Sequence, residues 1–330
     1  MISLISGAAG QDGIILGRKL IQQGNTVVGL CRPEQKDFLI ESVPGIQSMA
    51  INLTEKSYLY ELLDRWQPSE IYNLAAFSSV RKSWDQPDVS TVINCALPAL
   101  FLDWIKKYSL RTKFIQASSS EIFGGSAFGP QTEMSDLSPI TPYGLTKAYA
   151  HQLVGMYREE YGLFASNAIL YNHESPIRKT EYVTRHVSKT VAEISLGFKN
   201  SLEIGNLSAT RDWGWALDYV AGMILLARTD TPGDYIFATG EQHSVAELVK
   251  AAFTSIGIYD FERYIRNSES QVRKVDPGSL FGDSSKAEHD LGWKKTIDFN
   301  GIVDTMVQSD LRSLQTGGTY KWLTDSKIWS

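Results

Sequence analysis

The sequence is poor in the residues that build disulfides and metal sites. Its 330 residues include only two cysteines, Cys31 and Cys95, and both lie in hydrophobic stretches. We therefore expect two reduced, buried core residues rather than a functional pair. No group of histidines, cysteines and carboxylates has the spacing of metal ligands, so the sequence predicts no bound metal.

Concentrated charge and long apolar segments are also missing. The net charge is −5 without a basic block, which argues against nucleic acid or an anionic membrane as the main partner. The first residues, MISLISGAAG, lack the basic and apolar regions of a signal peptide. No stretch approaches the ~18–20 apolar residues that span a membrane. These absences favour a cytoplasmic protein.

The sequence does contain short apolar runs that alternate with helical stretches. Strands are predicted at 2–5, 26–31, 70–74 and 113–117, and helices at 13–23, 57–66 and 92–107. This alternation is typical of a parallel sheet covered by helices on both faces. The hydrophobic content of 43% allows one large domain or two joined ones.

After residue 170 the alternation loosens, and loops are predicted at 173–180 and 265–282. A helix at 215–228 precedes a short strand near Tyr235, which is a candidate to rejoin the large sheet. The predicted fold class is therefore α/β, a doubly wound parallel sheet with a smaller, discontinuous α/β lobe for the substrate.

Three glycines, Gly7, Gly10 and Gly13, lie between the first strand and the first helix. At such a place glycines allow a tight turn, and backbone N–H groups at the start of the helix bind a pyrophosphate. A plain turn is the alternative, but the context favours a dinucleotide and a Rossmann-type sheet. Arg32, which follows the second strand where an acidic residue would hold a ribose hydroxyl, favours NADP over NAD. The alternative is that Arg32 is a solvated surface charge, and it would then not distinguish NADP from NAD.

A second group of polar residues follows the strand at 113–117. Ser119 and Glu121 would lie at the carboxyl edge of the sheet, where open α/β folds bind ligands, although both residue types also cap helices. Tyr143 and Lys147 are four apart on a predicted helix and so share one face. An ammonium group there can favour the phenolate and lower a pKa that starts near about 10, which makes the tyrosine a usable base.

The residues that carry these features resemble a known family. Gly7 to Gly13, Tyr143 and Lys147 are similar to the extended short-chain dehydrogenase/reductase superfamily. More narrowly, segments between residues 6 and 293 resemble GDP-mannose 4,6-dehydratases, namely SGAAGQDG, YNLAAFSSV, QASSSEIFG, ILYNHESP, YVTRHV, GNLSATRDWGWALDYV and GDSSKAEHDLGW. The resemblance implies that residues 1–170 with about 210–238 form an NADP-binding domain. It places a nucleotide-sugar lobe at about 171–209 and 239–330.

The resemblance also implies a reaction. Tyr143, tuned by Lys147, would take the proton of the sugar C4 hydroxyl while hydride moves to the nicotinamide. Glu121, with Ser119, would remove the C5 proton and help expel water from C6, and hydride would return to C6. The implied cofactor contacts are Gly7, Gly10, Gln11, Asp12, Gly13, Arg32, Asn52, Leu53, Leu74, Ala75, Ala76, Tyr143, Lys147, His173 and Arg178. The implied substrate contacts are Ser78, Ser119, Glu121, Asn172, Val183, His186, Arg211, Arg273 and Asp276.

Several positions depart from the family's usual pattern. His186 stands where the family has lysine, and Asn52 where it has aspartate. Phe77 and Ser79 replace a glutamine and a histidine close to the expected hexose, which leaves a GDP-heptose or a GDP-N-acetylhexosamine as competing substrates. Pro33 and Glu34 replace an arginine-rich segment that helps relatives form tetramers. The resemblance implies a homodimer, with a homotetramer as the alternative.

Two other functional classes remain open from the residues. A nucleotide-sugar 4-epimerase or 4-ketosugar reductase of the same superfamily would use tyrosine and lysine without a carboxylate after the serines, so Glu121 discriminates against it. A catalytically silent NADP-binding protein would not need Ser119, Glu121, Tyr143 and Lys147 together. The sequence therefore favours a GDP-sugar dehydratase, a hydro-lyase with bound NADP.

Overall fold

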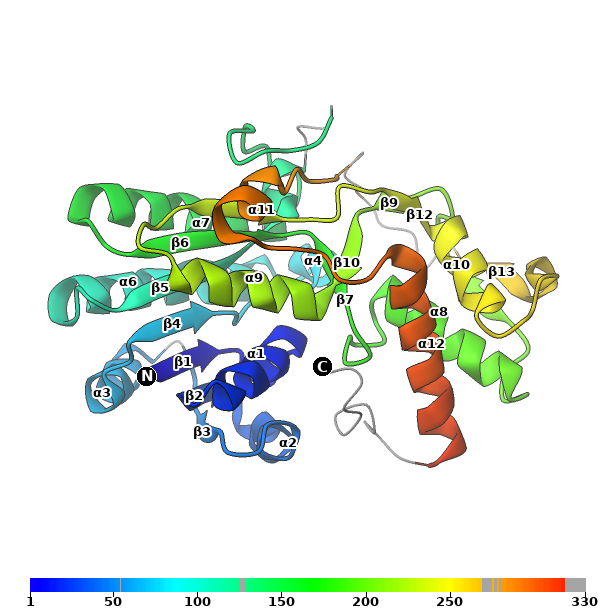
Figure 1. The fold of residues 1–330 in the computed structure, drawn as a ribbon, viewed down its shortest axis with the longest axis horizontal. Coiled ribbons are helices and arrows are strands. Elements are labelled where there is room, and N and C mark those ends of the chain that lie inside the picture. Colours follow the sequence, from blue (N-terminus) through cyan, green and yellow to red (C-terminus); the bar gives the residue numbers. More distant parts are fainter. Residues whose placement is uncertain (54, 125–128, 269–274, 276–277, 279, 318–330) are drawn as a thin grey trace.

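The computed structural model describes residues 1–53, 55–124, 129–268, 275, 278 and 280–317. Its centre is a seven-stranded sheet in which all neighbouring strands run parallel (Figure 1). The strand order reverses beside β1, which leaves a crevice at the carboxyl ends of the strands. In sheet order the strands are β11 (Asp234–Phe237), β6 (Ala165–Leu170), β5 (Lys113–Ser119), β4 (Glu70–Asn73), β1 (Ile2–Ser6), β2 (Thr26–Cys31) and β3 (Gln47–Ala50).

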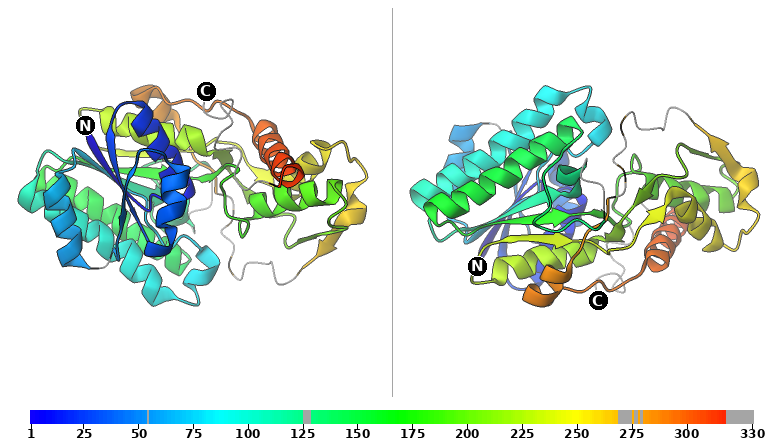
Figure 2. Two further views of the ribbon diagram at one scale, coloured as in Figure 1. Left: turned by 90° about the horizontal axis from the view of Figure 1, so that it is seen from below. Right: turned by 90° about the horizontal axis from the view of Figure 1, so that it is seen from above.

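Helices cover both faces of this sheet, as Figure 2 shows. One hydrophobic core lies under α1 (Gln11–Gln22), α2 (Lys36–Ser42), α9 (Ala216–Arg228) and α11 (Ser285–Leu291). A second core lies on the other face, under α3 (Lys56–Trp66), α6 (Leu97–Tyr108) and α7 (Pro142–Tyr161). Because both faces are covered, β4 and β6 are buried at every position. The predicted doubly wound, Rossmann-type sheet is confirmed.

The second half of the chain builds a lobe beside the carboxyl ends of the strands (Figure 1). A third core joins the helices α8 (Val183–Ser195), α10 (Val245–Thr254) and α12 (Phe299–Gln315). Three short strand pairs border it, β7 (Asn172–Glu174) with β10 (Trp213–Trp215), β8 (Leu202–Ile204) with β13 (Ile265–Asn267), and β9 (Thr210–Arg211) with β12 (His243–Ser244). Between lobe segments the chain returns to the large sheet as β11, at the strand predicted near Tyr235.

The remaining elements are short turns of helix. They comprise α4 (Val80–Ser83), α5 (Pro87–Thr91), a π-helical turn at Val92–Ala96, and the 3-10 turns Pro33–Gln35, Ser120–Phe123 and Phe261–Tyr264. Two predicted loops were wrong in part, since the segment at 173–180 begins inside β7 and the segment at 265–282 begins with β13. Of the cysteines, both free, Cys31 is buried as expected, whereas Cys95 is only partly buried.

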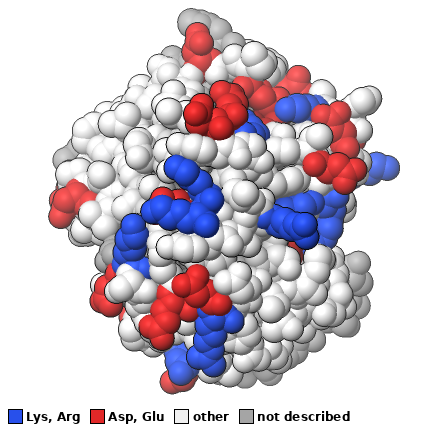
Figure 3. All heavy atoms as spheres, turned by 90° about the vertical axis from the view of Figure 1, so that its left-hand side faces the viewer, with Lys and Arg blue, Asp and Glu red and all other residues white. Residues whose placement is uncertain are grey.

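One helical stretch is longer and more apolar than expected, since the sequence was predicted to contain no stretch long enough to span a membrane. Pro87–Tyr108 forms 22 continuous helical residues that are long and apolar enough, by length and composition, to cross a membrane. Its inner side belongs to the core, where Phe101, Trp104 and Ile105 are fully buried against α3 and α7. On the face of the molecule in Figure 3, lysines and arginines lie interspersed with aspartates and glutamates, in keeping with the small net charge.

Candidate active site

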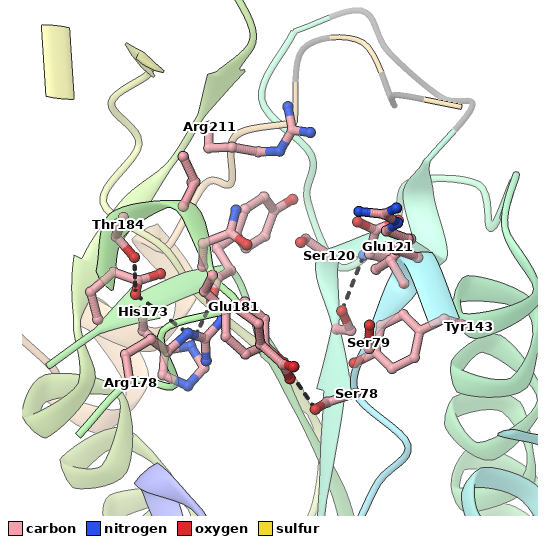
Figure 4. A pocket seen from close by; sticks show the side chains of 18 of the residues that line it. Ser78, Ser79, Ser120, Glu121, Tyr143, His173, Arg178, Glu181, Thr184 and Arg211 are labelled. Carbon is pink, nitrogen blue, oxygen red and sulfur yellow. Dashed lines mark hydrogen bonds and ion pairs between the residues drawn. The ribbon is translucent and has the colours of Figure 1, made fainter. Parts of the chain in front are cut away.

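A large cavity of about 780 Å³ opens between the carboxyl ends of the sheet strands and the lobe. Its walls come from the first turn of α1, from the loop after β4 and α4, from the turn after β5, from α7, and from β7, α8, β9 and β10 of the lobe. Figure 4 shows Ser78, Glu121 and Tyr143 on one side and His173, Arg178 and Thr184 on the other. Ligands of open α/β folds bind in this position.

The turn that enters α1 requires glycine at two positions. Gly7 has a φ of +70°, and a Cβ there would lie 2.8 Å from backbone atoms of Ala75. A Cβ on Gly13 would lie 2.5 Å from the carbonyl oxygen of Gly7. Helix α1 follows Gly10 without a side-chain cap among the described residues, so the N–H groups of its first turn point to an anion site. The turn therefore fits the pyrophosphate of a dinucleotide.

The predicted cofactor residues fall into two groups. Those that line the cavity are Asp12, Leu74, Ala76, Tyr143, Lys147, His173 and Arg178. The others do not line it and lie at the β1–α1 turn or just after β2, β3 and β4, namely Gly7, Gly10, Gln11, Gly13, Arg32, Asn52, Leu53 and Ala75. Arg32 is exposed beyond β2, with Nε 3.2 Å from both Glu34 Oε1 and Gln35 Oε1.

The four predicted catalytic residues are brought together on one side of the cavity. Ser119 ends β5, Glu121 lies in the following turn, and Tyr143 and Lys147 lie one turn apart on α7. All four are buried and line the cavity. The backbone N–H of Glu121 donates to Ser119 Oγ at 3.3 Å, which holds the carboxylate and the hydroxyl on one turn.

The start of α7 fixes the direction of its catalytic side chains. Thr141 caps the helix, accepting a hydrogen bond at Oγ1 from the N–H of Gly144 at 3.0 Å, and Pro142 occupies the first helical position. Gly144 is also constrained, since a Cβ would lie 2.6 Å from the carbonyl oxygen of Glu121. The helix N-terminus therefore packs directly on the turn that carries Glu121.

The pKa of Tyr143 differs from the sequence-based expectation. Burial raises the pKa of this phenol, and a hydrogen bond with Ser119 offsets part of the rise. Burial also lowers the pKa of Lys147 to about 8. The Lys147 Nζ donates to the carbonyl of Ala117 at 2.7 Å and lies 5.9 Å from the centre of the Tyr143 ring. The expected net lowering of the phenol pKa was wrong, because burial raises the pKa by more than the Ser119 hydrogen bond and the Arg178 charge lower it.

The lobe side of the cavity is held by one ion pair and one hydrogen bond that share a carboxylate oxygen of Glu174. Arg178 Nε lies 3.4 Å from Glu174 Oε2, and Thr184 Oγ1 donates to the same oxygen at 2.6 Å. The Arg178 guanidinium stacks over the ring of Tyr182 at 3.8 Å from its centre. Because Glu174 favours the charged form, the pKa of Arg178 is raised despite the opposing effect of burial. A permanent cation therefore faces the cavity.

Four predicted substrate residues line the lobe side, namely Asn172, Val183, His186 and Arg211. The Nε2 of His186 is 2.8 Å from the carbonyl oxygen of Glu203, so this ring nitrogen carries a proton and donates to it. Arg211 lies on β9 and is buried. Ser78 lines the opposite wall. Arg273 and Asp276 lie outside the described residues.

The model of the family described as GDP-mannose 4,6 dehydratase matches residues 4–306. The chain belongs to this dehydratase family. It is 37% identical over 326 residues to GDP-mannose 4,6 dehydratase 2 of Arabidopsis thaliana, covering 94% of this chain and 87% of that protein. It is 35% identical over 344 residues to the human GDP-mannose 4,6 dehydratase, covering 96% of this chain and 92% of that protein.

Solved structures of other nucleotide-sugar enzymes share the fold. The UDP-glucose 4-epimerase of Thermotoga maritima with UDP-glucose has a TM-score of 0.85 at 22% identity, covering 95% of this chain and all of that one. The dTDP-glucose 4,6-dehydratase of Bacillus anthracis in complex with NAD has a TM-score of 0.82 at 19% identity, covering 98% and 99%. At these identities the likeness concerns the fold.

Sequence reasoning about the dehydratase family missed several residues of the cavity. Glu174, Tyr182, Thr184 and Trp213 line it and were not predicted. All four lie inside segments that carry the family resemblance, NHESP, YVTRHV and RDWG, so sequence comparison could have pointed to these positions. It could not have revealed their contacts, because each depends on how the lobe folds back onto the sheet.

Proposed function

We propose that the protein is a GDP-mannose 4,6-dehydratase, which converts GDP-mannose to GDP-4-keto-6-deoxymannose and water. The observation that carries this proposal is the placement of Glu121 beside Ser119 and Tyr143 in one buried cluster. An epimerase or reductase needs only the tyrosine and its lysine, whereas a dehydratase also needs a carboxylate for the second proton transfer. The names of the two relatives described above agree with it.

We propose a nicotinamide dinucleotide, specifically NADP, as the resident cofactor, held by the segments given as 1–170 and about 210–238. The glycine turn fits its pyrophosphate, and Lys147 and Tyr143 are the residues that would contact its nicotinamide ribose. Arg32 supports NADP because an exposed guanidinium beyond β2 can pair with a 2′-phosphate. Held there, the nicotinamide would supply the hydride chemistry, oxidation at C4 and reduction at C6, and its positive charge would favour the phenolate of Tyr143.

The chain's own residues move the protons. Tyr143 accepts the proton of the C4 hydroxyl as C4 becomes a ketone. The ketone makes the C5 hydrogen acidic, so Glu121 takes that proton and passes a proton to the C6 hydroxyl, which leaves as water. Tyr143 then returns its proton to C5. The sugar loses one water overall, and both side chains regain their starting states.

The lobe residues bind the nucleotide in this proposal. Arg211 is a buried cation on the cavity wall, and its guanidinium fork suits the diphosphate of the sugar nucleotide, whereas Arg178 is the proposed contact to a phosphate of the cofactor. Asn172 and Val183 line the same lobe wall as these arginines. Arg273 and Asp276, outside the described residues, remain proposed contacts to phosphate and ribose.

We also propose a homodimer, with a tetramer as the alternative. Helix α7 exposes Leu145, Tyr149 and Met156 on its outer side, and Val92 is exposed on the neighbouring helical stretch. These side chains are 46–64% exposed, so a monomer would leave a continuous apolar strip in water. A second copy packed through the same helices would cover it.

The experiment that tests the reaction is incubation of the purified protein with a panel of GDP-linked sugars and mass analysis of the products. We expect GDP-mannose to lose one water without added cofactor, since the cofactor is regenerated in each cycle. Loss of water from a GDP-heptose or a GDP-N-acetylhexosamine alone would keep the reaction class and change the substrate. Isomerisation without loss of water would overturn the dehydratase.

A further inference from the structure

A hydrogen bond between two hydroxyl groups crosses the cavity. The Oη of Tyr182 lies 3.0 Å from the Oγ of Ser78, although the two residues are 104 positions apart. Ser78 comes from the loop after β4, and Tyr182 immediately precedes α8 in the lobe. Figure 4 shows Ser78 reaching out from the wall that carries Tyr143. The bond therefore joins the two halves of the site next to the proposed base.

The backbone around Tyr182 gives this side chain a fixed direction. Its N–H donates to the carbonyl of Lys179 at 3.1 Å, and its carbonyl accepts from the N–H of His186 at 2.8 Å. The ring is stacked against Arg178, which Glu174 holds in place. A phenol fixed on both its backbone and its face presents its hydroxyl at a defined point with little loss of conformational entropy.

A flanking ion pair holds the same two loops together. Lys82 Nζ lies 3.0 Å from Glu181 Oε2. Lys82 follows Ser78 by four residues, and Glu181 immediately precedes Tyr182. Both side chains are exposed, so this pair by itself stabilises the contact only weakly. It connects the same two segments as the hydrogen bond between Ser78 and Tyr182 and adds a small stabilisation to that contact.

Each hydroxyl can both donate and accept a hydrogen bond. A neutral bond of this kind in a partly wet cleft is worth only about 0.5–1.5 kcal/mol, so a ligand hydroxyl can replace either partner. The phenol of Tyr182 is also close enough to Tyr143 to affect its titration. Figure 4 shows Ser78 beside Tyr143, and Ser78 is hydrogen-bonded to Tyr182, so this hydroxyl pair lies at the sugar end of the cavity, beside the proposed C4 base.

We propose that Tyr182 is a specificity-determining residue. When substrate binds, its hydroxyl gives up the hydrogen bond to Ser78 and makes one to a hydroxyl of the hexose instead. This inference rests on the proposed function, because it requires a hexose next to Tyr143. A site built to hydrogen-bond a substrate hydroxyl discriminates strongly against ligands that lack it, since its polar group is then left unpaired. Tyr182 thus reads the sugar and not the nucleotide.

The test compares GDP-mannose with GDP in calorimetric titrations of the cofactor-loaded protein. Tyr182→Phe keeps the ring on Arg178 and removes only the hydroxyl. We expect this variant to bind GDP-mannose about tenfold more weakly and GDP within about twofold of the wild type. Its KM should rise by a similar factor with a smaller change in kcat. Tyr259→Phe, which removes a hydroxyl from a 75% exposed tyrosine, serves as the matched control and should change neither.

Ser78→Ala provides a second variant that removes the partner instead. We expect a weaker loss for GDP-mannose than in Tyr182→Phe, and a double variant that is no worse than Tyr182→Phe by itself. Unchanged binding of GDP-mannose by Tyr182→Phe would overturn the proposal, and so would an equal loss for GDP. If the wild type turns over another nucleotide sugar instead, the proposed function fails. The same comparison, made with that sugar and its nucleoside diphosphate, still tests Tyr182.

Discussion

The Nε2 of His173 lies 2.9 Å from Oδ2 of Asp12 and links strand β7 of the lobe to the first turn of α1. The other ring nitrogen, Nδ1, is 2.7 Å from the carbonyl oxygen of Tyr171, so both nitrogens donate and the imidazole is held as a cation. Against the opposing effect of burial, Asp12 raises the pKa of His173, and His173 lowers that of Asp12. The pair joins the sheet to the lobe beside the cofactor turn.

Replacing Asp12 with asparagine should destabilise the protein by about 2 kcal/mol, because a buried cation loses its partner. The stabilisation from His173 is complete below its unfolded pKa of 6.5 and is lost as pH rises through the higher folded value. That from Asp12 is complete above 3.8 and is lost as pH falls through the lower folded value. Urea unfolding should therefore show the largest difference from wild type between pH 3.8 and 6.5, and a smaller one once the pH exceeds the raised folded pKa of His173.

A matched control for this variant is Asp37→Asn. Asp37 also lies in the first turn of a helix, α2, but is exposed and should cost little at either pH. An equal loss in both variants would show that the helix dipole, and not His173, is responsible for the effect.

Lys147→Met should stabilise the cofactor-free protein near neutral pH by about 1–2 kcal/mol, after the loss of the hydrogen bond to Ala117. The folded pKa of about 8 lies below the unfolded value of 10.5, so the unfolded chain binds more protons between them. The free energy of unfolding of the wild type therefore rises between about pH 8 and 10.5, and the stability gained from Lys147→Met disappears over the same range. Thermal unfolding as a function of pH measures the effect. Lys36→Met, at an exposed site, should show no such pH dependence.

Tyr143→Phe should block the first oxidation. The phenyl ring fills the same buried space but cannot accept the proton of the C4 hydroxyl, so we expect a loss of at least about 10³ in kcat. Mixing the cofactor-loaded variant with GDP-mannose and recording nicotinamide absorbance checks this. Reduction at the wild-type rate would exclude Tyr143 as the base.

Glu121→Gln should act one step later. The amide cannot take the C5 proton, so the product should lose no water, while cofactor affinity stays within about twofold. Nicotinamide reduction should still occur on mixing with substrate, which separates this variant from Tyr143→Phe. Turnover as in the wild type would remove Glu121 from the mechanism.

Arg32→Ala should weaken NADP about tenfold and leave NAD nearly unchanged, because the guanidinium is expected to contact only the 2′-phosphate. Fluorescence titration of both cofactors measures the ratio. Arg111→Ala, an exposed arginine at the amino ends of the strands, provides the control. An equal loss of affinity for NADP and NAD would show that Arg32 does not bind the 2′-phosphate.

The fold was predictable where local patterns decide it. The strand at 26–31 was predicted to the residue, because its short apolar stretch is bounded by turn residues, and all of it except Thr26 is buried. Strand β3 was missed, since its four residues, QSMA, are half-exposed and carry little apolar signal. Strand β7 consists of the polar residues Asn172, His173 and Glu174 and exists only because β10 pairs with it.

The same division applies to the site. The spacing of Tyr143 and Lys147 correctly placed both side chains on one face of α7. It could not reveal that Lys147 points its ammonium at the carbonyl of Ala117, or that burial would dominate the phenol. The contact of Tyr182 with Ser78 joins two segments that are 104 residues apart in the sequence, so no local pattern could predict it.

The return of the chain to the sheet as β11 has a practical consequence for anyone who wishes to express the nucleotide-binding half separately. A truncation after β6 would remove the strand that pairs with its outer edge. It would also strip α9 from one face, although every residue of β6 is buried in the intact protein. The fragment would present an unpaired apolar border, the kind of edge from which aggregates grow. Gene fragments should therefore keep both halves together.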